Sequence, residues 1–399
     1  MNEITNSVRT AELIRQKPNI LVIGVGGGGG NALNQMIENN VGNVSYIAIN
    51  TDAAALANSL ADQRIQIGKQ LLAGLGAGAK PELGKAAMEE DKRELDACLE
   101  NVEMVFLTCG LGGGTGTGAI PLIAGMCRER NILTVAVVTT PFFMEGFIRN
   151  SNSKQGLENL KSCVDTLLVI PNDRLLEDAY CDYSFEECLK LADEVLVDSV
   201  SAICNIIFQD GMINIDFGDV RTIMENTGLA YIGFGRAHSS SGLMDALEEA
   251  IHSPLLETDI RGAKKLIINC SGKVSMSDMQ KALTHIHSCT NPEANIILGT
   301  VKTPNAEEEI CVTIIATELE QREKDTDTWN SQNTKVQVMG TAKPLKVENT
   351  YAEPMPYQYR NQSVTKRKEE NKVGVYRYGN RQEELKIPSF IKQYTEKRG

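Results

Sequence analysis

The chain has 399 residues, with 40 Lys and Arg against 52 Asp and Glu, and hence a formal net charge of −12. This length suffices for two or more folded domains, and 42% hydrophobic residues excludes a wholly disordered chain. The ten cysteines form no C-x-x-C pair, which argues against zinc and thioredoxin-type sites. No apolar run is long enough to span a membrane, and none resembles a signal peptide. We therefore expect a cytoplasmic protein with free thiols and no direct membrane insertion.

The charge is distributed unevenly along the chain. Residues 322–399 carry 16 basic and 10 acidic residues, a balance of +6, which leaves −18 for the first 321 residues. Because nucleic-acid binders present a basic face, the acidic body predicts no nucleic-acid partner. The basic tail is compatible with a contact to an acidic partner or a membrane surface, and equally with a segment that mixed charge keeps soluble.

The first half of the chain alternates between apolar and helical segments. Strands are predicted at 19–25, 44–49, 102–108, 132–138 and 166–170, and helices at 31–38 and 120–130. Pro121 is expected in the first turn of the second helix, where proline is tolerated. This alternation predicts an α/β layer with a mostly parallel sheet.

A long helix and a second, smaller unit are predicted next. Ser184–Glu187 form a capping box, and apolar residues at helical spacing continue to about Gln209. Such a helix of roughly 24 residues is about 36 Å long, enough to connect two domains. Strands at 265–270, 295–300 and 309–317 and a helix at 276–287 then predict a smaller α/β unit.

Two glycine-rich segments each follow a predicted strand and precede a predicted helix. Gly24–Asn31 (GVGGGGGN) predicts a phosphate site, because glycines allow close backbone approach and the helix N-terminus is partially positive. Alone it also fits the dinucleotide pattern G-x-G-x-x-G, with Asp52 ending the next strand. It lacks the Lys-Ser/Thr of a P-loop.

The second segment, Gly110–Gly118 (GLGGGTGTG), separates these possibilities. A dinucleotide has one pyrophosphate, whereas two glycine segments at neighbouring strand ends can hold a longer polyanion such as a triphosphate. Thr115 and Thr117 are expected to add hydroxyl donors.

Gly112–Gly118 (GGGTGTG) resembles the signature of the tubulin and FtsZ superfamily. The similarity to bacterial FtsZ covers about residues 17–320. It includes Val22–Asn31, Asn50–Asp52, Gly74–Gly78 with Pro81 and Glu82, Thr140–Phe142 with Glu145, Gly146 and Arg149, Ile170–Asp173, Asn214–Asp219 and Ser253–Glu257. Ile387–Ile391 is similar to the family's C-terminal partner-binding peptide.

The resemblance implies a nucleotide-binding role for a defined set of residues. They are Gly26, Gly27, Gly28, Gly29, Gly30 and Asn31 at the phosphates and nucleoside, Asp52 at the next strand end, Gly112, Gly113, Gly114, Thr115, Gly116 and Thr117 at the β- and γ-phosphates, Glu145 and Arg149 at the ribose and phosphates, and Asn172, Leu189 and Asp193 at the base. A carboxylate at the base suits guanine, which offers N1–H and N2–H donors. Leu189 stands where the family usually has a phenylalanine, so an aromatic stack on the base is lost.

Three further residues, Asn214, Asp216 and Asp219, are implied to be catalytic. Paired carboxylates at this spacing can orient a water for attack on a γ-phosphate, in the family within the nucleotide site of the next subunit. The alternative is that they only form turns. Asp216–Gly218 also spells the kinase motif D-F-G, but no H-R-D segment accompanies it.

The implied fold is a Rossmann-like parallel-sheet GTPase domain joined by a long central helix to a smaller α/β domain. The predicted divisions are a flexible segment at 1–16, a GTP-binding domain at 17–183, the central helix at 184–210, a C-terminal domain at 211–321, a disordered linker at 322–384 and a partner-binding peptide at 385–399.

The implied function is that of a GTPase that polymerises head to tail and builds the contractile division ring at the middle of a bacterial cell. GTP or GDP would be bound with Mg²⁺ held mainly by phosphates and water, and no metal site made of protein ligands is expected. Adaptor and membrane-anchor proteins would bind residues 385–392. The alternatives are a GTP-binding filament scaffold with little hydrolysis and an NAD-dependent oxidoreductase.

Overall fold

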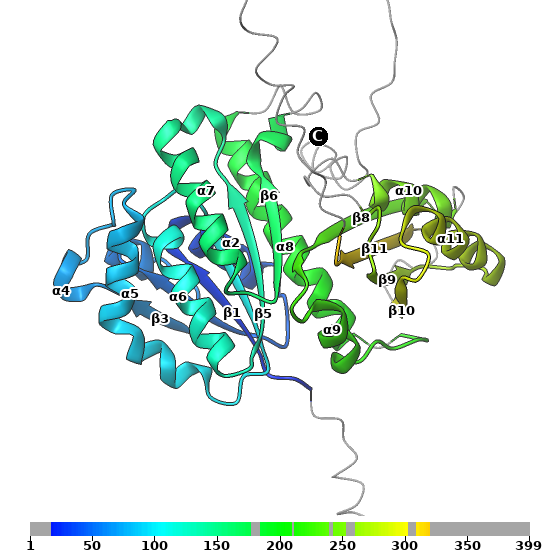
Figure 1. Ribbon diagram of the computed structural model, residues 1–399, viewed down its shortest axis with the longest axis horizontal. Coiled ribbons are helices and arrows are strands. Elements are labelled where there is room, and N and C mark those ends of the chain that lie inside the picture. Colours follow the sequence, from blue (N-terminus) through cyan, green and yellow to red (C-terminus); the bar gives the residue numbers. More distant parts are fainter. Residues whose placement is uncertain are drawn as a thin grey trace, which may run out of the picture. The chain divides into compact units, whose positions relative to one another are not determined.

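The computed structural model describes residues 17–176, 184–209, 211–238, 242–252, 260–301 and 309–319. These residues form two sheets, one of seven strands and one of four, with helices packed on them (Figure 1). The segments predicted at 1–16, 322–384 and 385–399 lie outside the described residues.

The first sheet is parallel throughout and has the strand order β3-β2-β1-β4-β5-β6-β7. Its strands are β1 (Ile20–Val25), β2 (Ser45–Asn50), β3 (Gln63–Gln66), β4 (Met104–Gly110), β5 (Leu133–Thr140), β6 (Thr166–Pro171) and β7 (Gly228–Leu229). Every residue of β1 is buried, as expected for a strand covered on both faces. The predicted parallel α/β layer is confirmed.

The helices of this layer are α2 (Gly26–Glu38), α3 (Ala53–Ala57), α4 (Lys69–Leu72), α5 (Pro81–Asp96), α6 (Thr115–Glu129) and α7 (Phe147–Lys161). The helices predicted at 31–38 and 120–130 both begin five residues earlier, within the glycine segments. Pro121 therefore lies inside α6 and not in its first turn, so that prediction was wrong. Because glycine has a low helix propensity, the glycine segments were not expected to be helical. In the folded chain, packing against the sheet outweighs this low propensity.

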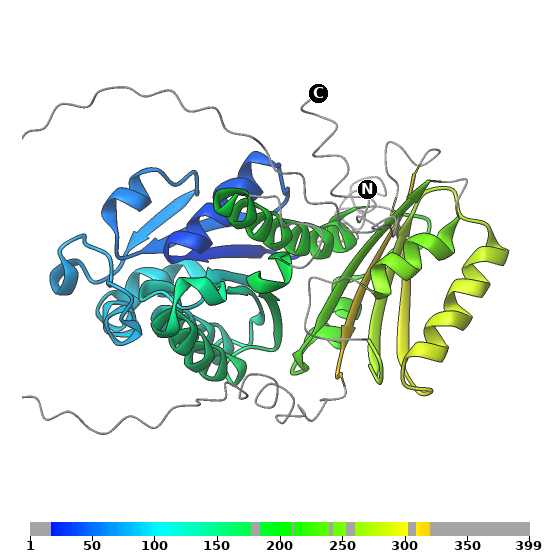
Figure 2. The ribbon, with the colours of Figure 1, turned by 90° about the horizontal axis from the view of Figure 1, so that it is seen from above.

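The long helix is confirmed as α8 (Phe185–Phe208), 24 residues capped by the predicted box. The Ser184 hydroxyl accepts a hydrogen bond from the Glu187 amide, and the Glu187 carboxylate accepts one from the Ser184 amide. Its buried residues include Ala192, Leu196 and Ile203. They pack toward α2, β5 and β6, so the helix lies along one face of the first sheet (Figure 2).

The second sheet is mixed, with the strand order β10-β9-β11-β8. Its strands are β8 (Tyr231–His238), β9 (Lys265–Ser271), β10 (Asn295–Val301) and β11 (Glu309–Thr317), and the nearby helices are α9 (Phe217–Met224), α10 (Leu243–Ile251) and α11 (Met276–Cys289). The predicted strands and helix are confirmed, and β8 was missed. Gly233 and Gly235 give β8 a loop-like composition, yet a Cβ at either would lie within 2 Å of a carbonyl oxygen of α10. They are glycines because α10 packs directly on the strand.

Candidate functional site

The predicted nucleotide-binding residues converge on one edge of the first sheet. Because β1, β2, β4, β5 and β6 are parallel, the segments that follow them all leave from the carboxyl edge. These segments hold both glycine runs, Asp52, Glu145 and Asn172. The chain order reverses between β1 and β4, and the crevice at such a switch point is where open α/β sheets bind ligands.

The two glycine segments contact each other at this switch point. A Cβ on Gly26 would lie 3.0 Å from the Gly116 amide nitrogen, and one on Gly28 would lie 3.2 Å from the Gly110 nitrogen. Gly26 also has φ +74°, a conformation that favours glycine. The N-termini of α2 and α6, each with unbonded amides, therefore lie side by side, which makes a ready site for several phosphate groups.

Only some of these glycines face open space. No other atom lies within 4 Å of the Cβ position of Gly27, Gly30 or Gly113. A Cβ on Gly114 would instead meet the Ala77 side chain at 2.7 Å, and one on Gly118 would lie 1.9 Å from the Pro81 carbonyl oxygen. The glycines of the second run therefore have two different roles. Gly113 leaves space for a ligand, whereas Gly118 allows α5 to pack closely on α6.

The hydroxyls of Thr115 and Thr117 form hydrogen bonds within the protein at this site. Thr115 Oγ1 lies 2.8 Å from Thr51 Oγ1, and Thr117 Oγ1 accepts a hydrogen bond of 2.9 Å from the Gly112 amide. Both side chains are buried. The hydroxyls were expected to face the phosphates, and in the structure they fix the shape of the loop. Asp52 likewise caps α3 by accepting from the amides of Ala54 and Ala55.

A polar pair lies beyond β5. The Glu145 carboxylate accepts a hydrogen bond from the Phe142 amide at 2.9 Å and from Arg149 Nη1 at 2.5 Å. The Arg149 backbone carbonyl packs on Gly112, whose Cβ position is 2.8 Å away. This pair is therefore joined to the second glycine run, and the half-exposed guanidinium is available to an anion.

Asn172 and Asp193, both predicted at the base, lie in surroundings that are unusual for polar side chains. In the described part of the chain only Thr108 Oγ1 and Asn172 Oδ1 are buried side-chain oxygens or nitrogens that lack a hydrogen bond, and both lie at this edge. Such orphaned atoms are rare and call for an explanation, and a ligand donor would satisfy the Asn172 oxygen. On α8, burial raises the pKa of Asp193 to about 7, and the neighbouring Glu194 adds to the shift. A carboxyl kept from solvent in this way is typical of a binding position.

Leu189, on the first turns of α8, is partly exposed. One turn earlier Phe185 is also exposed, and its ring contacts the buried Phe142 with 5.6 Å between centroids. The start of α8 thus carries an aromatic ring, although not at position 189.

The predicted catalytic residues lie elsewhere in the same chain. The loop after α8 carries Asn214, whose side chain accepts from the Gly211 amide at 2.7 Å. Asp216 and Asp219 form a reciprocal capping box at the start of α9. At 2.9 Å Asp216 Oδ1 accepts from the Asp219 amide, and at 3.2 Å Asp219 Oδ2 accepts from the Asp216 amide. All three therefore stabilise local turns, as the alternative interpretation expected.

Helix α9 packs at the edge of the first sheet opposite to the glycine runs. Arg221 donates to the carbonyl of Glu103, which precedes β4. Thr166, the first residue of β6, donates to the carbonyl of Met224, and the Asn226 amide donates to Asp165. These partners all lie at the amino edge of the sheet. A single chain consequently does not bring its acids and its glycine runs together.

Two residues that support the site were not predicted. Thr51 pairs with Thr115, and its only signal in the sequence was its place in Asn50–Asp52. Asn152 on α7 donates to the carbonyls of Ala79 and Gly112, which ties α7 to the second glycine run. Nothing in the local sequence distinguishes Asn152 from other polar helix residues.

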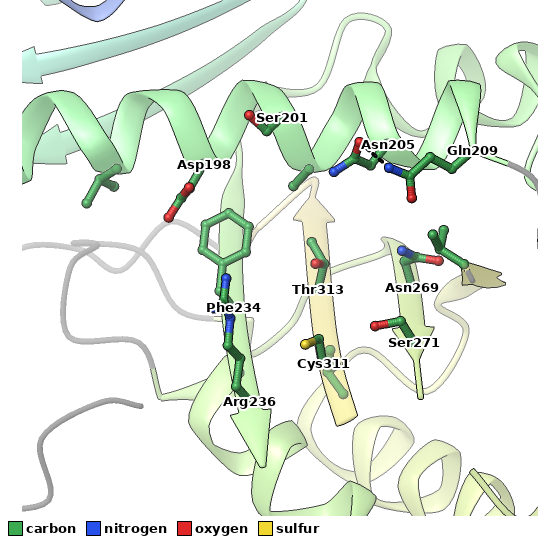
Figure 3. A pocket seen from close by; sticks show the side chains of 15 residues that line it. Asp198, Ser201, Asn205, Gln209, Phe234, Arg236, Asn269, Ser271, Cys311 and Thr313 are labelled. Atoms are coloured by element: carbon green, nitrogen blue, oxygen red, sulfur yellow. Dashed lines mark hydrogen bonds between the residues drawn. The ribbon is translucent and has the colours of Figure 1, made fainter. Parts of the chain in front are cut away.

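A separate cavity of about 230 Å³ lies between α8 and the second sheet (Figure 3). Its lining is mixed: polar residues such as Asp198, Asn205 and Arg236 stand beside apolar ones such as Val195 and Phe234. On its α8 wall Gln209 donates to the Asn205 side chain at 2.7 Å. No predicted site residue lines it, so it is distinct from the glycine-rich site.

The described segments also bear on metals and membranes. Among their residues, no three His, Cys, Asp or Glu side chains are grouped so that they could ligate a metal ion. No helix that the structure describes is both long and apolar enough to cross a bilayer.

Comparisons with known proteins agree with this geometry. A family model described as the tubulin/FtsZ family GTPase domain matches residues 19–180, and one described as the FtsZ family C-terminal domain matches residues 228–320. An FtsZ dimer from M. jannaschii is 38% identical, with a TM-score of 0.72 over 79% of this chain and 92% of that one. A second M. jannaschii FtsZ structure is 39% identical, with the same TM-score over 79% and 96%. A protofilament of CetZ2 from Haloferax volcanii with bound GTPγS is 20% identical and shares the fold, with a TM-score of 0.66 over 76% and 94%. The paired glycine runs, the long helix and the mixed second sheet thus identify this chain as a member of the tubulin/FtsZ family of GTPases.

Proposed function

We propose that this chain binds GTP at the carboxyl edge of its first sheet, polymerises head to tail, and hydrolyses GTP in a site completed by Asn214, Asp216 and Asp219 of the next subunit. Its role would be to build the bacterial division ring, with adaptors bound through residues 385–392. The similarity to FtsZ supports this role. Residues 17–183 would form the GTP-binding domain, and residues 211–321 the domain that supplies the acids.

The single observation that carries the proposal is the position of the acids. Helix α9 bonds to the amino edge of the sheet, whereas the glycine runs lie at the carboxyl edge. Phosphoryl transfer needs groups placed at the γ-phosphate, so an acid at the far edge can act only on another subunit's nucleotide. A contact between unlike ends does not close on itself and so produces a filament.

The chemistry of the site fits a guanine nucleotide. The amides at the starts of α2 and α6 would hold the phosphates, and the partly buried carboxyl of Asp193 would accept from the guanine N1–H and N2–H groups. Mg²⁺ would neutralise phosphate charge. Because Thr115 is paired with Thr51 and Asp52 caps α3, phosphate oxygens and water would supply most of its ligands.

A mixing experiment tests catalysis between subunits. Thr115 and Thr117 changed together to valine should lose GTP affinity, because the Thr51 hydroxyl and the Gly112 amide would lose their partners. Asp219→Ala should bind GTP and assemble but release little phosphate. Mixed together, the first variant offers intact acids to the nucleotide on the second, so phosphate release should exceed the sum of the separate rates. In mixtures shown by sedimentation to co-assemble, release equal to that sum contradicts the proposal.

The same preparations distinguish the alternatives. A filament scaffold would scatter light with GTP while phosphate release stayed near the uncatalysed level. An oxidoreductase would release a nicotinamide dinucleotide on denaturation, in place of GDP. Thermal melts of both variants control for misfolding.

A further inference from the structure

Three side chains spaced four residues apart lie along one face of α8, near its start. They are Phe185, Leu189 and Asp193, and residues at this spacing are neighbours on a helix surface. Phe185 is 50% exposed and Leu189 38%, whereas the Asp193 carboxyl is partly buried. We call these three residues the α8 stripe. It leads from an exposed ring to a carboxyl that is withdrawn from solvent.

Two other segments meet the start of α8 at the carboxyl edge of the first sheet. Helix α8 packs against β5, β6 and the short 3₁₀ helix η3 (Asn172–Leu176). The Phe185 ring contacts the Phe142 ring, which follows β5, with 5.6 Å between centroids and the planes inclined by 56°. The Phe143 amide donates to Asp173 at 2.8 Å, which joins the segment after β5 to η3. These contacts hold the α8 stripe beside the residues predicted at the nucleoside.

The Phe185 ring rests on a fixed partner. Phe142 is fully buried, and its amide donates to Glu145 at 2.9 Å. A ring that is held by such a neighbour and keeps half of its surface exposed can contact a ligand with little loss of conformational entropy. Phe142 cannot offer the same surface, because none of it is exposed.

The polar groups next to the stripe are acceptors. Asn172, 5% exposed, has a side-chain oxygen with no hydrogen-bond partner, and a buried oxygen of this kind calls for a donor. The Asp193 carboxylate is also an acceptor. Guanine offers N–H donors at one edge and apolar faces above and below its ring, so acceptors beside an aromatic surface match both features.

The spacing along α8 sets which part of the base each residue can reach. Four residues of helix rise about 6 Å, so Phe185 lies about 12 Å from Asp193 along the axis. A guanine whose N1–H and N2–H groups bond to Asp193 extends its five-membered ring back along the helix toward Phe185. Leu189 lies between the two, beneath the middle of the base.

We propose that Phe185 is a specificity-determining residue that packs on the five-membered ring of the bound guanine. The inference rests on the proposed function and deepens it. Leucine at position 189 leaves the base without an aromatic contact there, and Phe185 supplies one from the preceding turn of the same face.

Nuclear magnetic resonance locates the ring directly. The full chain with ¹³C-labelled phenylalanine rings is loaded with GDP, and a nuclear Overhauser effect should join a Phe185 ring proton to guanine H8, the proton on the five-membered ring. Phe185→Leu identifies the signal, because the cross-peak should vanish in that variant. A cross-peak from H8 to another phenylalanine, with none to Phe185, overturns the inference.

Calorimetric titration measures what the contact contributes. Phe185→Leu should raise the Kd for GDP by about two- to tenfold, the range for one aromatic contact. The affinity for inorganic pyrophosphate, which has no base, should not change. Phe147→Leu is the matched control: it removes an 86% exposed ring on α7 and should leave the GDP affinity unchanged.

A swap variant separates contact with the base from a purely structural role of the ring. Phe185→Leu combined with Leu189→Phe moves the ring by one turn on the same face, and it should restore the GDP affinity to about the wild-type value. A ring that only packs on Phe142 would give a different result, because GDP and pyrophosphate would then weaken together and the swap would restore neither.

The remaining outcomes distinguish this inference from the proposed function. If Phe185→Leu binds GDP like the wild type, or if GDP and pyrophosphate weaken equally, the assignment of Phe185 is overturned while the guanine site stands. A wild-type chain that binds neither GDP nor GTP overturns the proposed function, and this inference with it.

Discussion

Asp216 and Asp219 stabilise the start of α9 in the structure, and we propose that they also act in catalysis. Substituting each by asparagine distinguishes the structural role from the catalytic one. Each carboxylate accepts one backbone hydrogen bond at the start of α9. An asparagine side-chain oxygen accepts the same bond, and asparagine caps helices about as well as aspartate. It has no negative charge with which to act on a water. Asp216→Asn and Asp219→Asn should therefore keep the fold and lose the chemistry.

The magnitudes differ enough to be measured. Asp216→Ala removes the cap and should destabilise the protein by about 1 kcal/mol, which corresponds to a fall in melting temperature of about 2–4 °C in a domain of this size. Asp216→Asn should cost only a few tenths of a kcal/mol, from the lost charge near the helix N-terminus. Both should lower turnover by about 10²–10⁴-fold, the usual range for a group that assists proton transfer.

The assay combines phosphate release above the critical concentration, sedimentation and thermal melting. The expected pattern is filaments that persist with slow release in both variants, and a lower melting temperature only in Asp216→Ala. If Asp216→Asn forms filaments and turns over within threefold of wild type, the carboxylates serve the turn alone and the catalytic assignment is refuted.

Three further predictions concern the nucleotide site. Leu189→Phe should strengthen GDP binding by a few-fold to about tenfold, since an aromatic contact is worth about 0.5–1.5 kcal/mol, and unchanged affinity in a calorimetric titration would place position 189 away from the base. Gly114→Ala should destabilise the protein by about 1–3 kcal/mol through overpacking, because the new Cβ would lie 2.7 Å from a neighbouring side chain. The control is Gly113→Ala, whose Cβ would lie in open space, so that this variant should have the melting temperature of the wild type. GDP affinity should fall as the pH is lowered from 8 to 6, because the pKa of Asp193 is raised to about 7 and guanine needs the carboxylate. The stability of the nucleotide-free protein changes in the opposite direction. Because the pKa of Asp193 is higher in the folded state than in the unfolded state, its charge destabilises the fold above pH 7. Protonation of Asp193 relieves this destabilisation as the pH falls through 7. Asp193→Asn should abolish both dependences, and a pH-independent affinity in the wild type would exclude this carboxyl from the base.

Local signals in the sequence were enough to predict most of the strands, the long helix α8 and a candidate phosphate-binding site, whereas α3, α4, α5, α7, α9 and α10 were not predicted. The buried strands are continuous apolar runs, and the start of α8 is a capping box whose partners are three residues apart. The two glycine runs follow strands, so their convergence at one edge could be expected from parallel strand geometry. In each case the deciding contact lies within a few residues or follows from a general rule of sheets.

Only the tertiary structure decided how the individual residues are used. Glycines 26–30 belong to α2, and Pro121 lies inside α6, because packing on the sheet outweighs local propensity. The need for glycine at position 114 is explained by Ala77, which precedes α5 and would clash with a side chain there. The buried Thr115 hydroxyl is explained by Thr51, a residue 64 positions away in the chain. The acids and the glycine runs are each local motifs, yet their separation to opposite edges depends on bonds from α9 to Glu103 and Thr166. Pairings between distant residues leave no periodic pattern in the sequence, and so the separation of the acids from the glycine runs within one chain was visible only in the folded structure.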